Sequence, residues 1–175
     1  MKNIFCFIFF TIGSWAFSQE IPTTTLKDLD GSKVSLNQLI ENDNITVLSF
    51  WATWCVPCIN ELDAIADIYD EWKDETKVNL IAIATDDTRT KKRIRPLVNG
   101  KGWEYIVLYD DNQDLKRALN ITTLPHTLVL KNNKIIHRRT GYIPGAEDDL
   151  YAVSYTHLRA HETEADLVCR LLLEK

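Results

Sequence analysis

Two cysteines three residues apart are the residues of this sequence best suited to chemistry. Cys55 and Cys58 lie in the segment 50–58, which reads FWATWCVPC. Two thiols at this spacing can close a disulfide bond, and a thiolate can exchange that bond with a disulfide of a substrate. The pair therefore predicts thiol-disulfide exchange, in which Cys55 attacks the substrate and Cys58 resolves the mixed disulfide.

The elements on either side of the pair should position it. Residues 45–51 read ITVLSFW, a short and nearly apolar run that predicts a buried central strand. After Cys58, apolar residues from Leu62 to Trp72 recur at steps of three and four, which predicts an amphipathic helix. The N-terminus of that helix should stabilise a thiolate on Cys55, because free N–H groups and a partial positive charge gather there. Pro57 fits the first helical turn, where its missing N–H costs nothing.

Two other interpretations of the pair stay open at this point. The cysteines could be half of a zinc site, with His126 and His137 as the remaining ligands. They could also form an inert structural disulfide. Trp51 and Trp54 beside the pair favour a shaped, partly exposed redox site, so we predict no metal and no cofactor.

The rest of the chain alternates between strand and helix patterns. This alternation predicts an α/β fold with a mixed sheet covered by helices on both faces. Asp30-Gly31 predicts the turn of a small N-terminal hairpin, and Asn132-Asn133 predicts the turn of a closing hairpin. The expected strands are 78–84, 105–108, 126–130 and 134–139, and the expected helices are 88–99 (interrupted by Pro96), 113–119 and one that opens at Ala146.

Bulk properties place this fold in one domain. The chain has 175 residues, of which 45% are hydrophobic, and its formal net charge is −5 with both signs mixed along it. Nothing in this charge pattern indicates the basic face that nucleic-acid binding requires. We expect a monomer.

The two ends of the chain differ from its middle. Residues 1–18 have a positive start, an apolar run and small residues at Ala16 and Ser18, which predicts a signal peptide cut before Gln19; an uncleaved membrane anchor is the alternative. The segment from about Val153 to Lys175 resembles a tail that recurs on unrelated conceptual translations, where sequencing-adapter DNA has been read as protein. We therefore expect residues 19–152 to form the domain and residues 153–175 to be non-native.

Around Trp54 and the CVPC motif the chain resembles the thioredoxin superfamily. The signal peptide, Glu61, and an additional helix and strand between Ala84 and Asp110 make residues 21–152 similar to its TlpA/ResA-like branch of extracytoplasmic thiol-disulfide oxidoreductases. The resemblance implies a thioredoxin-like fold with an N-terminal hairpin and a helix-strand insertion. It also implies that the protein works in the periplasm or another extracytoplasmic compartment.

The resemblance also implies roles for residues outside the CVPC motif. Pro125 would be a cis-proline that faces the disulfide and presents the Leu124 backbone to a substrate peptide, next to Trp54; the alternative is an ordinary trans proline. Glu61 would be a partly buried acid that exchanges a proton with Cys58; the alternative is a glutamate on the solvent face of its helix. Ser49 stands where cytoplasmic thioredoxins carry a buried aspartate, which makes Glu61 more important. His126 could tune the thiolate or touch substrate; the alternative is a histidine on the surface of its strand.

Three functions remain open at this level. The first is a reductase of protein disulfides, with apocytochrome c as a candidate substrate and a membrane thiol carrier as electron donor. The second is a disulfide oxidant with the same residues. The third is a redox-inactive peptide-binding domain, and the CVPC pair argues against it.

Overall fold

The computed structural model describes residues 19–40 and 44–158. The predicted signal peptide and the end of the predicted tail lie outside these residues. Within them, no helix is both long and apolar enough to cross a membrane. The strands are β1 (Thr25–Lys27), β2 (Lys33–Ser35), β3 (Ile45–Trp51), β4 (Asn79–Ala84), β5 (Ile106–Tyr109), β6 (His126–Lys131) and β7 (Lys134–Thr140).

The helices lie between these strands. They are α1 (Leu36–Leu39), α2 (Val56–Thr76), the 3-10 turn η1 (Lys91–Arg93), α3 (Ile94–Lys101) and α4 (Asp114–Ala118). A last helix covers residues 146–158. It opens at Ala146 as predicted and continues without a break past Val153, where the predicted tail begins.

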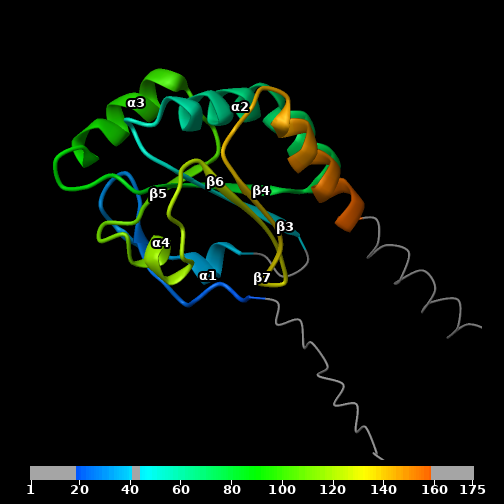
Figure 1. Cartoon of the computed structure of the whole chain (residues 1–175), viewed down its shortest axis with the longest axis horizontal. Coiled ribbons are helices and arrows are strands. Elements are labelled where there is room, and N and C mark those ends of the chain that lie inside the picture. Colours follow the sequence, from blue (N-terminus) through cyan, green and yellow to red (C-terminus); the bar gives the residue numbers. More distant parts are fainter. Residues whose placement is uncertain (1–18, 41–43, 159–175) are drawn as a thin grey trace, which may run out of the picture.

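The strands form one mixed sheet in the order β2-β1-β5-β4-β3-β6-β7 (Figure 1). The three strands at its centre, β5, β4 and β3, run parallel to one another. The N-terminal hairpin joins one edge and the closing hairpin joins the other, each by antiparallel pairing. The carboxyl ends of the parallel strands therefore meet at one edge of the sheet, and β3 delivers Cys55 to that edge.

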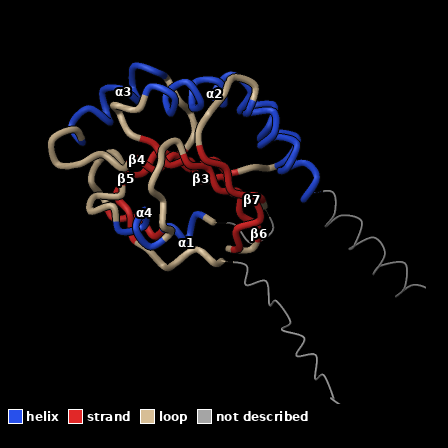
Figure 2. The backbone as a smooth tube through the Cα atoms, viewed as in Figure 1, coloured by secondary structure: helices blue, strands red, loops and turns tan. Residues whose placement is uncertain are grey.

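Helices cover both faces of the sheet (Figure 2). Helices α2 and α3 and the helix 146–158 lie on one face, and α1 and α4 lie on the other. Each face has its own buried core: Leu62 and Trp72 of α2 belong to the first, and Leu36 of α1 and Leu115 of α4 belong to the second. This arrangement confirms the predicted α/β class with helices on both sides.

The segment 88–99 differs from its prediction. It was expected to be a helix interrupted by Pro96, but residues 88–90 form turns, and α3 starts only at Ile94. Asp87 causes the turns, because its Oδ1 accepts hydrogen bonds from the backbone N–H groups of Arg89 (2.9 Å) and Thr90 (3.1 Å). Pro96 then lies in the first turn of α3, where a helix tolerates proline, so it interrupts nothing.

Candidate functional site

Cys55 and Cys58 form a disulfide at the start of α2. Their Cα atoms are 5.3 Å apart. Cys55 is the N-cap residue with extended backbone, and Pro57 occupies the first turn, as predicted. The Cys55 carbonyl accepts hydrogen bonds from the N–H groups of Cys58 and Ile59, both at 3.1 Å. The bond that joins the two sulfurs leaves neither thiol free to bind zinc in this state.

The two cysteine residues differ slightly in exposure. Cys55 is 6% exposed and Cys58 is fully buried. Trp54 and Val56, the neighbours of Cys55 in the chain, are 59% and 65% exposed. A substrate can therefore approach Cys55 across an apolar rim, formed by the exposed side chains of Trp54 and Val56. Cys58 is fully buried in the core.

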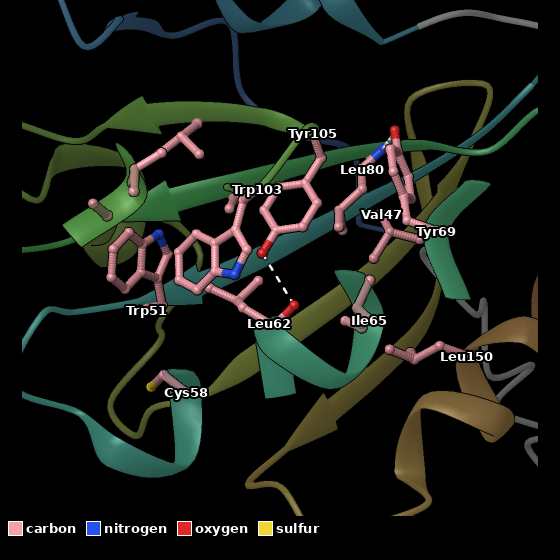
Figure 3. Close-up of a cluster of buried hydrophobic side chains, with 14 of the residues drawn as sticks. Val47, Trp51, Cys58, Leu62, Ile65, Tyr69, Leu80, Trp103, Tyr105 and Leu150 are labelled. Carbon is pink, nitrogen blue, oxygen red and sulfur yellow. Dashed lines mark hydrogen bonds between the residues drawn. The ribbon is translucent and has the colours of Figure 1, made fainter. Parts of the chain in front are cut away.

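An aromatic cluster lies behind the disulfide (Figure 3). Trp51 packs edge-on against Trp103 with ring centroids 5.2 Å apart, and Trp103 stacks on Tyr105 at 5.6 Å. The Tyr105 hydroxyl donates a hydrogen bond of 3.1 Å to the Leu62 carbonyl in α2. These contacts fix the end of β3 against α2, and so they fix the strand-turn-helix junction that holds the cysteines.

A buried aspartate holds the loop that leads to Cys55. Asp86, two residues after the end of β4, accepts hydrogen bonds from the Thr53 N–H at 3.0 Å and from the Thr53 hydroxyl at 2.5 Å. Its own backbone lies at the same sheet edge as the disulfide, because β3 and β4 are parallel and in register up to Trp51 and Ala84. Asp86 was not among the site residues predicted from the sequence.

Pro125 follows a cis peptide bond from Leu124, as the resemblance implied. Its carbonyl accepts a hydrogen bond of 2.8 Å from the Gly141 N–H. This bond joins the start of β6 to the loop after β7. Leu124 itself is half-buried and packs against both cores.

Glu61 is fully buried, so the solvent-face alternative is wrong. Its Oε1 accepts hydrogen bonds from Arg139 Nη2 at 2.5 Å and the Thr127 hydroxyl at 3.1 Å, and its Oε2 accepts one from the Ser49 hydroxyl at 3.3 Å. Burial raises the pKa of Glu61 above its ordinary value of 4.5, and the Arg139 guanidinium offsets part of that rise. Cys58 lies one turn earlier on the same side of α2.

His126 is also buried, so it does not lie on the surface. Its Nε2 is 3.3 Å from Arg138 Nη1, and its Nδ1 is 2.9 Å from the Thr140 hydroxyl. Because a guanidinium can only donate, Nε2 must accept and the proton of the neutral ring belongs on Nδ1. Burial and the charge of Arg138 lower the pKa of His126, so the neutral form is favoured.

Fold and site together define a thioredoxin-like thiol-disulfide oxidoreductase. The model of the AhpC/TSA family matches residues 17–139, and the chain belongs to that family. A thioredoxin-like protein from Porphyromonas gingivalis is 40% identical, with a TM-score of 0.68 over 79% of this chain and 90% of its own.

Two curated relatives are more distant. The thiol-disulfide oxidoreductase ResA of Bacillus thuringiensis is 29% identical over 70% of this chain and 69% of its own length. The thioredoxin-like protein YneN of Bacillus subtilis is 28% identical over 67% of each. A thiol:disulfide interchange protein DsbE from Chlorobium tepidum is 18% identical and shares the fold, with a TM-score of 0.68 over 79% of this chain and 96% of its own.

Proposed function

We propose that this chain is an exported reductase of protein disulfides in which Cys55 attacks and Cys58 resolves. The observation that carries this proposal is the asymmetry of the pair. Cys55 caps the N-terminus of α2 beside an exposed apolar rim, and Cys58 is fully buried one turn inside the helix. A helix N-terminus favours a sulfur anion, and only an accessible sulfur can reach a folded substrate.

The reaction proceeds through one mixed disulfide. The Cys55 thiolate attacks one sulfur of the substrate disulfide, a bond forms between the two, and the other substrate sulfur leaves with the electron pair. The Cys58 thiol then loses its proton and attacks the Cys55 sulfur. The mixed disulfide breaks, the second substrate sulfur leaves as a thiolate, and the Cys55–Cys58 disulfide remains. Two electrons have passed from the pair to the substrate.

Other residues assist this exchange. Glu61 takes the proton that leaves the Cys58 thiol, since both residues are buried one turn apart on α2. Trp54, Leu124 and Pro125 hold the substrate peptide in an extended form across the disulfide. The exposed Trp54 ring and the half-buried Leu124 support this placement.

Location and partners are part of the same proposal. Residues 1–18 carry the pattern of a signal peptide, so the protein acts in the periplasm or another extracytoplasmic space. A disulfide oxidoreductase of Mycobacterium tuberculosis that shares the fold is described as secreted. A membrane thiol carrier resupplies the electrons, and apocytochrome c, whose cysteines must be reduced before haem attachment, is the candidate substrate.

The reduction potential of the Cys55–Cys58 pair tests this function. We expect a value near or below about −230 mV, at which the reduced pair is a strong donor. It is measured by following Trp54 fluorescence in thiol buffers of set potential, with Cys55→Ser as the variant that must not titrate. A value near about −120 mV would instead indicate a disulfide oxidant. No titration at all would leave a peptide-binding domain without redox activity.

A further inference from the structure

The buried partner of Glu61 is an arginine that was not among the residues predicted from the sequence. Arg139 lies near the end of β7, and its side chain is 15% exposed. Its Nη2 contacts Glu61 Oε1 at 2.5 Å, and its Nη1 donates to the Ala146 carbonyl at the start of the last helix. Within the described residues its buried Nε has no hydrogen-bond partner. The guanidinium is thus held between α2 and the chain that follows β7.

Two effects act on the Glu61 carboxyl in opposite directions. Burial favours the neutral acid, whereas the Arg139 charge and the hydroxyls of Ser49 and Thr127 favour the carboxylate. Without the cation, burial would favour the neutral acid more strongly, and a protonated carboxyl cannot accept another proton. The cation therefore favours the form of Glu61 that can act as a base.

The other titratable groups near Glu61 do not compete for that proton. Tyr105 from the segment before β5 and Tyr142 after β7 both feel its charge, and burial raises the pKa of each phenol. Tyr142 also donates a hydrogen bond to Glu147 at 3.1 Å. Cys58, one turn from Glu61 on α2, is the group that must lose its proton before it can resolve the mixed disulfide.

We propose that Arg139 is a positioning residue that keeps Glu61 ionised, so that Glu61 can accept the proton leaving the Cys58 thiol in the resolving step. The step is a transfer from Cys58–SH to Glu61–COO⁻, which gives Cys58–S⁻ and Glu61–COOH. The thiolate then attacks Cys55 as described above, and the departing substrate thiolate or water takes the proton from Glu61. This inference rests on the proposed role of Glu61.

The test separates the two chemical steps in one experiment. The reduced full chain, carrying Cys6→Ser and Cys169→Ser, is mixed with dithionitrobenzoate, an aromatic disulfide whose thiolate product is coloured. A first release reports attack by Cys55, and a second reports resolution by Cys58. Both rates are measured across pH for the parent chain, Arg139→Met, Arg139→Lys, Glu61→Gln and the double variant Glu61→Gln/Arg139→Met.

We expect Arg139→Met to slow the second release at neutral pH about tenfold, because loss of the cation raises the pKa of Glu61 and leaves less of it ionised. The rate should recover at higher pH, because Glu61 then ionises without its cation. The first release should not change, and Arg139→Lys should restore most of the parent profile. Arg117→Met, which removes an exposed arginine paired with Asp114, is the matched control and should behave as the parent.

The outcomes distinguish this inference from the proposed function. If Glu61→Gln leaves the second release unchanged, the role of Glu61 is wrong and the inference falls with it. If Glu61→Gln slows that release but Arg139→Met matches the parent, only the inference is wrong. The double variant should resolve at the rate of Glu61→Gln, and a further slowing would contradict the inference even if Arg139→Met fails to fold.

Discussion

Cys55 and Cys58 share one helix turn and one chemistry, yet their surroundings differ. Cys55 keeps a small exposed surface beside an exposed tryptophan, whereas Cys58 is fully buried, and both belong to the core between α2 and the sheet. Three hydrogen bonds to Glu61 come from three neighbouring strands, β3, β6 and β7. One face of the sheet therefore supplies the polar side chains that hold Glu61, one turn from the buried Cys58.

The raised pKa of Glu61 makes a prediction about stability. The folded protein holds the Glu61 proton to higher pH than the unfolded chain, so the stabilisation from that proton is complete below about pH 4.5 and is lost as the pH rises through the folded pKa. Glu61→Gln cannot titrate. Urea unfolding of the oxidised protein across pH should show that the stability of the parent falls relative to Glu61→Gln over this window. Parallel curves would contradict the shift.

Asp86 should matter for stability through Thr53. Asp86→Ala removes both acceptors and leaves the Thr53 N–H without its partner, which should cost about 1–3 kcal/mol of the free energy of unfolding. Thr53→Ala removes only the hydroxyl bond and should cost less. Urea denaturation of both variants measures the difference, and equal losses would show that the backbone bond contributes nothing.

At the scale of elements, α2 connects the redox pair to the core. Its buried side carries Cys58, Glu61, Leu62, Ile65, Tyr69 and Trp72. The first two residues serve the site and the remainder anchor the helix against the sheet. The packing of these buried residues therefore holds the start of α2 in place.

Leu62→Ala tests that anchor. The side chain is fully buried, so its truncation should lower the free energy of unfolding by about 2–5 kcal/mol through lost burial and a residual cavity. Ile143→Ala, at an exposed apolar residue, should stay within about 0.5 kcal/mol of the parent. Guanidinium unfolding measures both. A loss for Leu62→Ala as small as that of the control would mean that the helix is not held by this core.

The elements themselves were largely predictable from the sequence. The buried run 45–51 became β3, and the Asn132-Asn133 turn became a hairpin in which both asparagines have positive φ. Strand β5 lies one residue later than expected, at Ile106–Tyr109. Periodicity and turn chemistry depend on residues close together in the sequence, so the elements that they predict are present in the fold.

The pairing of Glu61 with Arg139 was not predictable, and the reason is a register shift. A regular two-residue hairpin at Asn132-Asn133 would place Arg138 opposite Thr127. An irregularity between Val129 and Leu130 shifts the pairing by one, so Arg139 lies opposite Thr127 and beside Glu61. A one-residue shift exchanges the two faces of a strand. The hydrophobic pattern of β7 does not encode that bulge.

At the scale of the whole molecule, the last helix completes the fold. Leu150 is buried against α2, Ser154 is buried one turn later, and Lys131 Nζ donates to the His157 carbonyl at 2.6 Å. The Ser154 hydroxyl bonds back to the Leu150 carbonyl. The described contacts of this helix therefore extend beyond Ala152, into the segment that resembles an artefactual tail.

Two truncations separate these parts. A chain that ends at Leu158 should unfold with the same free energy as the full chain, because we propose that the remainder of the tail is foreign to the domain. A chain that ends at Ala152 loses the buried Ser154 and the Lys131 contact, and it should be less stable by about 1–2 kcal/mol. Thermal unfolding compares them. A loss on ending at Leu158 would show that residues 159–175 belong to the domain.

The central claim is that Cys55 attacks and Cys58 resolves, and trapping the mixed disulfide tests it most directly. Full chains carrying Cys6→Ser and Cys169→Ser, with either Cys58→Ser or Cys55→Ser, are reduced, mixed with dithionitrobenzoate at neutral pH and weighed by mass spectrometry. The account predicts one stable adduct on the Cys58→Ser chain, and an adduct at least about tenfold slower to form on the Cys55→Ser chain, whose remaining thiol is buried. Equal reactivity, or faster reaction at Cys58, would contradict it.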